Sequence, residues 1–326
     1  MAKNASCSNI TRSHVNRTRP VLILILSLIA GCQARLDLSG VQMQQSRPVQ
    51  RADLLQAAAE HAGTIVTVGA MGVILTSEDG GNSWQRTIVA GNPFFLDVSD
   101  CPTGAFYSID TVGVLWSRQS DNSWSSAPLP QGDEPQALTC DPTGKLWVVG
   151  GFATIMSSVD SGNSWDTFSL DEDIYLTTVQ FVDAVHGFVT GEFGIVLYTN
   201  DGGSSWQRAR ELPDSFYAQA AHFTDRNTGW VVGLNGTIWY TNDAAQSWQK
   251  ESNGNDAPLY GIDAIGDVLV AVGDNATVLY RRASDPTWSK LDSAVGTRMY
   301  LRAIVGLGDR KFAAGGGGVL FTGTLP

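Results

Sequence analysis

The stretch Thr199-Asn200-Asp201-Gly202-Gly203-Ser204-Ser205-Trp206 indicates the fold of this chain. The octet recurs, in more or less complete form, as Ser77–Trp84, Ser117–Trp124, Ser158–Trp165, Thr241–Trp248 and Arg281–Trp288. Successive closing tryptophans are 40, 41, 41, 42 and 40 residues apart. A fixed period of this length is typical of a repeat architecture in which each unit packs on its neighbours.

The octet is an Asp-box, and its residue types predict a structural role. An aspartate can accept hydrogen bonds from the backbone of its own turn, and glycine adopts the left-handed backbone that a tight turn needs. The closing tryptophan is expected to begin the next strand and to bury its ring between sheets. We therefore assign structure rather than catalysis to Asp79, Trp84, Asp160, Trp165, Asp201, Trp206, Asp243 and Trp248.

Each repeat carries four strand-like runs. In the repeat that ends with Trp206 they are Tyr175–Val182, Gly187–Thr190, Ile195–Thr199 and Trp206–Arg210. A glycine-bearing turn precedes the third run, and seven such turns occur along the chain, the first at Gly69–Gly72. Four strands in a unit of about 40 residues are typical of a β-propeller blade. The sequence predicts an all-β fold, a single propeller of seven four-stranded blades.

The seventh repeat reaches Pro326 after only three strands. A strand from the other end of the propeller would complete it, and Val41–Ser46 is the candidate. A blade completed in this way joins the two ends of the propeller and leaves no open sheet edge between the first and last blades.

The first residues read as an export signal. Four bases and no acid occur in residues 1–20, and Val21–Ile29 is an apolar run too short to span a membrane. Ile29-Ala30-Gly31-Cys32 resembles a bacterial lipobox, so we predict cleavage before Cys32 and lipid attachment to it. The predicted parts are a signal at 1–31, a tether with the lipidated cysteine and closing strand at 32–50, and the propeller at 51–326. Gln33 after the cysteine favours the outer membrane.

The net charge excludes one class of partner. The chain has a net charge of −11, and removing the signal leaves 17 bases against 32 acids. A body this acidic repels phosphate backbones, so we expect no nucleic-acid partner. Two cysteines outside the signal, Cys101 and Cys140, both precede a Pro-Thr-Gly turn. Export permits them to pair, but they could equally be two separate core residues.

A family resemblance rests on two further segments. Phe181-Val-Asp183-Ala-Val-His186-Gly187-Phe188 and Phe223-Thr-Asp225-Arg-Asn-Thr-Gly229-Trp230 each lead into a valine-glycine strand and then an Asp-box. This arrangement resembles the photosystem II stability/assembly factor family, the BNR-repeat propellers of cyanobacteria and chloroplasts. The resemblance extends over about residues 50–326.

The resemblance implies a non-enzymatic, lipid-anchored scaffold that binds a membrane-protein subunit. It places the protein in the periplasm, or in the thylakoid lumen of a photosynthetic source. We expect a monomeric propeller without a cofactor. An arginine-rich patch is associated with the family, and its nearest counterparts here are Arg208, Arg210, Arg281 and Arg282. Many acids dilute these arginines, which leaves an accessory role beside an envelope transporter of a non-photosynthetic bacterium as an alternative.

Asp-boxes also occur in sialidases, so a glycosidase or a carbohydrate-binding module is the alternative from another class. A sialidase needs three arginines that converge on a carboxylate, together with a Tyr-Glu pair, and the sequence offers no such set. The four histidines, at positions 14, 61, 186 and 222, have no metal-ligand spacing. We therefore predict no metal site and no catalytic residue.

Overall fold

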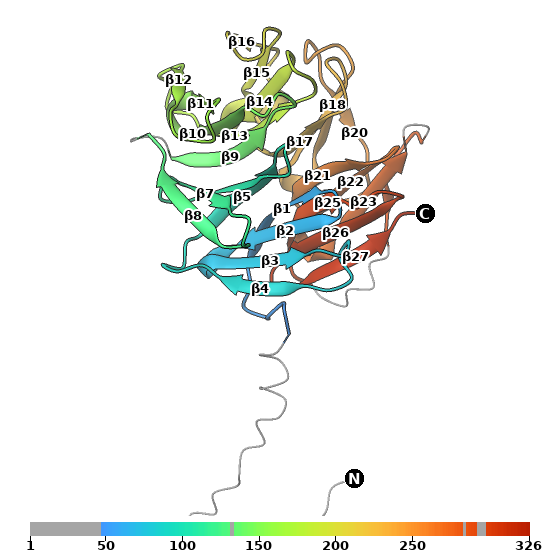
Figure 1. Ribbon diagram of the computed structural model, residues 1–326. Coiled ribbons are helices and arrows are strands. Elements are labelled where there is room, and N and C mark those ends of the chain that lie inside the picture. Colours follow the sequence, from blue (N-terminus) through green and yellow to red (C-terminus); the bar gives the residue numbers. More distant parts are fainter. Residues whose placement is uncertain (1–46, 131–133, 283–284, 292–297) are drawn as a thin grey trace, which may run out of the picture. The chain divides into compact units, whose positions relative to one another are not determined.

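The computed structural model describes residues 47–130, 134–282, 285–291 and 298–326. These residues form seven antiparallel sheets, which are the blades of a β-propeller (Figure 1). Blades 1 and 2 consist of β1 (Leu55–His61), β2 (Thr64–Gly69), β3 (Val73–Ser77) and β4 (Gln85–Ile88), then β5 (Phe95–Asp100), β6 (Phe106–Asp110), β7 (Val114–Arg118) and β8 (Trp124–Pro128). Blades 3 and 4 consist of β9 (Pro135–Cys140), β10 (Leu146–Gly150), β11 (Thr154–Ser158) and β12 (Asp166–Ser169), then β13 (Leu176–Phe181), β14 (Gly187–Gly191), β15 (Val196–Thr199) and β16 (Gln207–Arg208).

The remaining blades follow the same order. Blades 5 and 6 consist of β17 (Ala218–Phe223), β18 (Gly229–Gly233), β19 (Ile238–Thr241) and β20 (Gln249–Glu251), then β21 (Leu259–Ile265), β22 (Val268–Gly273), β23 (Val278–Arg282) and β24 (Ser289–Lys290). Blade 7 has β25 (Leu301–Gly306), β26 (Lys311–Gly316) and β27 (Leu320–Thr324). The strands predicted for the fourth repeat correspond to β13–β16 within a few residues at each end. The predicted all-β propeller is confirmed.

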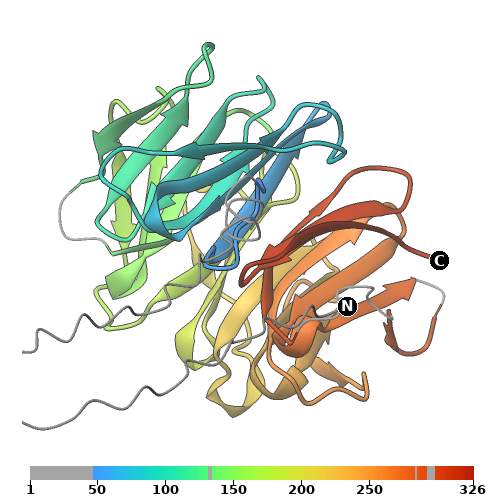
Figure 2. The ribbon, with the colours of Figure 1, turned by 90° about the horizontal axis from the view of Figure 1, so that it is seen from below.

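The first strand of each blade lies on the inside of the ring. Each inner strand contacts the inner strands of the two neighbouring blades, and β1 contacts β25, so the ring closes between blades 1 and 7 (Figure 2). Every sheet is a simple meander, with its strands paired in chain order. This topology places seven equivalent inner-strand positions around one central channel.

Closure of the ring depends on residues just before β1. Leu54 forms an antiparallel bridge with Gly317, and the Gly318 N–H donates to the Asp53 carbonyl at 2.7 Å. Blade 7 has three strands in the described part of the chain. The segment predicted to supply its fourth strand, Val41–Ser46, lies outside the described residues, so that expectation stays a prediction.

Apolar clusters fill the spaces between adjacent blades. Between blades 3 and 4 the ring of Trp147 stacks on Phe181 at 4.7 Å and meets the edge of Trp206 at 5.8 Å. Gly203, the second glycine of the fourth Asp-box, has φ +77° and lies against Trp147, whose indole would collide with any Cβ there. The glycine thus serves both the turn and the packing between blades.

The two faces of the ring differ in the turns that they carry. On one face, the turn after the second strand binds the loop before the first strand of its own blade, as in Ala70 N–H to Leu54 carbonyl at 3.0 Å. We call this the amino-terminal face, because residues 47–54 lead into β1 there. The opposite face carries the Asp-boxes, and we call it the Asp-box face. There the Asp-box of a blade binds the turn between the first two strands of that blade, as in the hydrogen bond from the Gly202 N–H to the Val185 carbonyl at 3.0 Å.

Short 3₁₀ turns occupy the amino-terminal face. They are η1 (Ala70–Gly72), η2 (Gly151–Ala153), η3 (Glu192–Gly194), η4 (Pro213–Ser215), η5 (Leu234–Gly236) and η6 (Asp274–Ala276). In the part of the chain that the structure covers, no helix has the length and apolar character needed to cross a membrane.

Candidate functional site

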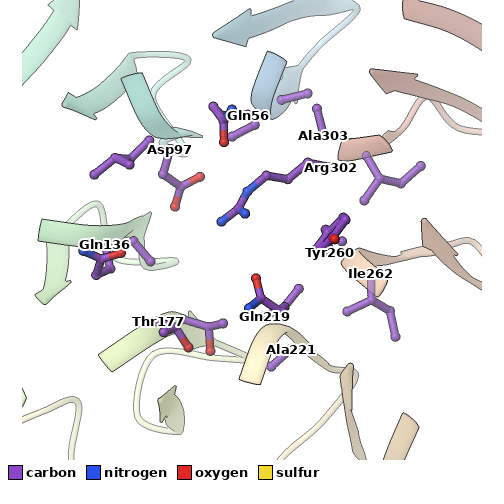
Figure 3. Close-up of a pocket in the computed structure, with 18 of the residues that line it drawn as sticks. Gln56, Asp97, Gln136, Thr177, Gln219, Ala221, Tyr260, Ile262, Arg302 and Ala303 are labelled. Carbon is purple, nitrogen blue, oxygen red and sulfur yellow. The ribbon is translucent and has the colours of Figure 1, made fainter. Parts of the chain in front are cut away.

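The central channel opens on the amino-terminal face through a ring of equivalent side chains (Figure 3). The pairing of the first two strands shifts by one residue near the start of each inner strand, for example between Leu301 and Ala303. The residue at the shift leaves the ladder, and a bulge of this kind re-aims its side chain. The seven residues at this position are Gln56, Leu96, Gln136, Thr177, Gln219, Tyr260 and Arg302.

Small residues below this ring keep the channel open. The next layer is mostly alanine and glycine, namely Ala57, Ala58, Ala137, Ala220, Ala221, Gly261 and Ala303. The resulting cavity measures about 210 Å³ and is lined mainly by polar groups. Figure 3 shows the Arg302 side chain extended from β25 into the middle of the ring.

Asp97 is the acid of this layer, and its oxygens are already engaged. One accepts the Val98 N–H at 2.9 Å, and the other accepts the Leu138 N–H of blade 3 at 2.8 Å. Burial raises the pKa of Asp97 to about 6, and the two N–H donors and the charge of Arg302 counteract that rise. Asp97 therefore ties blade 2 to blade 3 at the channel wall.

The other end of the channel is acidic. A cavity of about 450 Å³ there is lined by Glu60, Asp100 and Asp263, among others. Asp100 lies 3.1 Å from His61, and Asp263 lies 3.4 Å from His222. Burial raises the pKa of Asp100 and of Asp263, while burial lowers the pKa of His222. The channel is thus asymmetric, with Arg302 and Asp97 near one mouth and three carboxyl groups near the other.

Exposed apolar side chains gather on the amino-terminal face. Of the twelve large exposed apolar side chains in the described residues, nine lie in loops of this face: Leu54, Met71, Phe94, Val112, Phe152, Phe193, Tyr217, Leu234 and Met299. The Asp-box face carries Val159 and Val185. Apolar side chains exposed on one face of a domain can serve as a contact surface for another molecule.

Three of these side chains stand on strained backbone. Met71, Phe152 and Phe193 occupy the middle of η1, η2 and η3 with φ of 58°, 55° and 55°. Their exposed fractions are 65%, 56% and 60%. Left-handed backbone costs a non-glycine residue about 1 kcal/mol, except where asparagine takes it, as Asn235 and Asn275 do in blades 5 and 6. Strain that supports an exposed apolar group points to a functional requirement.

The four arginines expected at a partner contact lie on two separate blades. Arg208 on β16 binds Glu172 at 2.5 Å, and Arg281 on β23 binds Glu251 at 3.2 Å. Arg282 donates to the carbonyl of Pro326. Arg208 and Arg210 line a groove of about 380 Å³ between blades 4 and 5.

Sequence reasoning missed a third arginine of that groove. Arg226 also lines it, with Phe188 and Tyr198 at its floor. Arg226 lies in the first hairpin turn of the fifth repeat, and only the Asp-Arg-Asn turn pattern could have marked it as exposed.

The Asp-boxes form self-contained turns. Asp201 accepts hydrogen bonds from the Thr199 hydroxyl at 2.7 Å, the Ser205 N–H at 2.9 Å and the Ser205 hydroxyl at 2.7 Å. The hydroxyl of the serine before the tryptophan is the main group that holds the pKa of Asp79, Asp160 and Asp201 at about 2. The pKa of Asp243 is lowered in the same way.

The closing tryptophans are less uniform than expected. Trp206 is buried, whereas Trp84, Trp165 and Trp248 are half-buried. In the decayed box of blade 2, Asp121 takes over the acceptor role and binds the N–H and hydroxyl of Ser123 at 3.0 Å and 2.6 Å.

Cys101 and Cys140 form a disulfide between blades 2 and 3, with their Cα atoms 5.1 Å apart. The bond lies at the Asp-box end of β5 and β9, beside the hydrogen bond from the Cys140 N–H to the Ser99 hydroxyl at 3.2 Å. Cys32, the predicted lipid site, lies outside the described residues.

Comparisons with known proteins agree with this architecture. A family model described as Photosynthesis system II assembly factor YCF48 matches residues 116–219. A Photosystem II assembly lipoprotein Ycf48 of Prochlorococcus marinus is 31% identical over 151 residues, which cover 41% of this chain and 44% of that protein. The match therefore spans less than half of this curated relative. The resemblance to the photosystem II assembly factor family is confirmed.

Solved structures share the fold at low identity. YCF48 from Cyanidioschyzon merolae has a TM-score of 0.69 at 17% identity, covering 84% of this chain and 96% of that chain. A structure of YCF48 bound to D1 peptide has a TM-score of 0.71 at 14% identity, covering 86% and 94%. Virginiamycin B lyase from Staphylococcus aureus reaches 0.74 at 11% identity, covering 85% and 96%. These likenesses establish the propeller fold alone.

Proposed function

We propose that this chain is a non-enzymatic scaffold that binds a membrane-protein subunit and assists the assembly or stability of its complex. The observation that carries the proposal is the gathering of nine exposed apolar side chains on the amino-terminal face. The naming of its relatives as photosystem II assembly proteins, and a related propeller's complex with D1 peptide, support the same class of function.

The charges beside the apolar residues indicate the chemistry of the partner. Described acids in the loops of this face include Glu134, Glu172, Asp173, Glu192 and Asp214, in the same blades as Phe152 and Phe193 or in the loops that join them. Such a surface repels anionic lipid headgroups. It suits a protein segment that carries apolar and basic side chains.

A lipid on Cys32 would hold this face near a membrane. Cys32 precedes Arg47 by 15 residues. A chain of that length spans at most roughly 50 Å, so the amino-terminal face would remain within that distance of the anchoring surface. We infer export to the periplasmic side of a bacterial envelope, at the outer membrane by Gln33, or to the thylakoid lumen of a photosynthetic source.

The channel chemistry favours binding over catalysis. Its mouth presents amide groups, a threonine hydroxyl, Tyr260 and Arg302, while both oxygens of Asp97 are occupied by backbone N–H groups. A general acid or base must be free to exchange a proton with a substrate. Lyases with this fold do not transfer their activity to this chain, since a propeller hosts unrelated functions.

The test is co-purification from the native membrane. The full acylated protein is isolated from detergent-solubilised membranes beside Cys32→Ala, Phe152→Ser/Phe193→Ser and Val159→Ser, and the bound proteins are identified by mass spectrometry. Val159 is 78% exposed on the Asp-box face and controls for loss of an exposed apolar side chain. We expect one membrane-protein subunit with the wild type and Val159→Ser, depleted with the other two variants.

The identity of the captured subunit then separates the two envelope roles. A photosystem subunit indicates photosystem assembly, and a transporter subunit indicates the accessory role. Recovery of glycans without a stoichiometric protein, or equal recovery with the Phe152→Ser/Phe193→Ser variant, would contradict the proposal.

A further inference from the structure

The channel mouth holds the guanidinium of Arg302, which extends into the middle of the ring. Among the described residues, no hydrogen bond or ion pair joins the side chain of Arg302 to another group, and the same holds for Gln136 and Gln219 across the ring. Arg302 is half-buried. A cation in such a position needs an anionic partner to offset its lost hydration.

Asp97 attracts Arg302 through its charge but makes no hydrogen bond or ion pair with it among the described residues. It faces the same ring, but its two oxygens are held by the Val98 and Leu138 N–H groups. Gln56, Tyr260, Tyr300 and the carboxylate of Asp274 line a second cavity with Arg302. Within the described part of the chain, Asp274 makes no hydrogen bond or ion pair with the guanidinium. A planar guanidinium is therefore presented to the cavity with its N–H donors available.

We propose that the amino-terminal mouth of the channel is a binding site for a single carboxylate group, held by Arg302 and flanked by the amides of Gln136 and Gln219. A guanidinium fork matches the two oxygens of a carboxylate. The cavity of about 210 Å³ accommodates a group the size of one amino acid. The acids at the opposite mouth, Glu60, Asp100 and Asp263, repel an anion from that side, so the ligand enters from the amino-terminal face.

This proposal does not depend on the client of the scaffold. The carboxylate could belong to a free small molecule or to the end of a polypeptide, and both present the same group to Arg302. The alanine and glycine residues below the ring have small side chains or none, and they leave room for a short apolar substituent on the ligand.

The experiment is isothermal titration of the purified mature protein with N-acetylglycine, at constant ionic strength. Its neutral counterpart N-acetylglycinamide is the ligand control. Two further titrants, a short peptide with a free carboxyl terminus and the same peptide amidated, distinguish a polypeptide end from a small molecule. The variants are Arg302→Gln and the matched control Arg310→Gln, whose side chain is exposed in the turn between β25 and β26.

We expect the wild type and Arg310→Gln to bind at least one of the two carboxylates and neither amide. In Arg302→Gln the affinity should fall by about tenfold or more. Binding of N-acetylglycine would assign a small ligand, and binding of the free peptide alone would assign a polypeptide end. Near-ultraviolet circular dichroism verifies the fold of each variant. Failure of both carboxylates to bind the wild type, or equal binding by folded Arg302→Gln, would overturn this proposal. The proposed partner contact through the exposed apolar residues of the amino-terminal face would still stand.

Discussion

The guanidinium of Arg86 binds the carboxylate of Asp53 through both of its oxygens, with Nη1 2.7 Å from Oδ2 and Nη2 2.8 Å from Oδ1. The Asp53 side chain is 3% exposed. Because the carbonyl of Asp53 also accepts the Gly318 N–H, this residue connects the outer strand of blade 1 to the last blade. The ion pair therefore secures the closure of the ring.

Removal of this carboxylate should weaken the fold strongly. We expect Asp53→Ala to lower the free energy of unfolding by about 3 kcal/mol, because it leaves the Arg86 cation unpaired in a largely buried place. Urea unfolding provides the measurement. Asp267→Ala is the control, since its pair with Arg310 is 3.7 Å long and exposed, so its loss should change stability by less than about 1 kcal/mol. Equal losses in the two variants would contradict a role in closure.

The disulfide should contribute through the loop that it closes. Cys101 and Cys140 are 39 residues apart, and a loop of that length predicts about 3–4 kcal/mol in the chain-entropy account. We expect Cys101→Ser/Cys140→Ser to lose up to that amount in urea unfolding under oxidising conditions. Wild-type protein unfolded with a reductant should match the variant. A reductant effect on the variant itself would show that the loss arises elsewhere.

The sequence predicted those parts of the protein that repeat. Asp201, Gly203 and Trp206 recur with one period because each blade needs the same turn, so the blade count and most strand bounds followed from them. Arg302 escaped notice because one basic residue in an alternating strand has no distinctive pattern. Its significance arises only when the ring brings it to the same channel mouth as Gln136 and Gln219.

The apolar amino-terminal face was equally hidden from sequence analysis. Met71, Phe152 and Phe193 lie within glycine-bearing turns that were recognised, but a single apolar residue in a turn reads as a random exposed side chain. Only the closed ring assembles them on one side. Exposure and positive φ together distinguish them from core residues.

Relief of the strain at one of these turns should raise stability while weakening partner binding. Phe193→Asn introduces the residue that blades 5 and 6 use at the same position, and asparagine tolerates φ near 55°. We expect the free energy of unfolding to rise by up to about 1 kcal/mol and the recovery of the membrane-protein partner to fall. A variant that is less stable than the wild type would show that the phenylalanine ring supports the fold.

Because the pKa of Asp97 is raised in the folded protein, the free energy of unfolding depends on pH. Burial holds the pKa at about 6 in the folded protein, above the ordinary value near 3.8 that it has when unfolded. A raised carboxyl pKa means that the folded state binds the proton more tightly, so this group adds stability as pH falls from above 6 towards 4.

The size of that effect is measurable against a variant without the carboxyl group. Between about pH 7.5 and pH 5, the free energy of unfolding of the wild type should rise by about 1 kcal/mol relative to that of Asp97→Ala. The comparison with the variant cancels the contributions of all other titrating groups. Asp97→Ala should be less stable at every pH, because it leaves the Leu138 N–H without its acceptor. Urea unfolding at a series of pH values gives both quantities. A stability difference that is constant with pH would mean that Asp97 stays ionised because channel water hydrates it, and the link between its burial and its pKa would then be wrong.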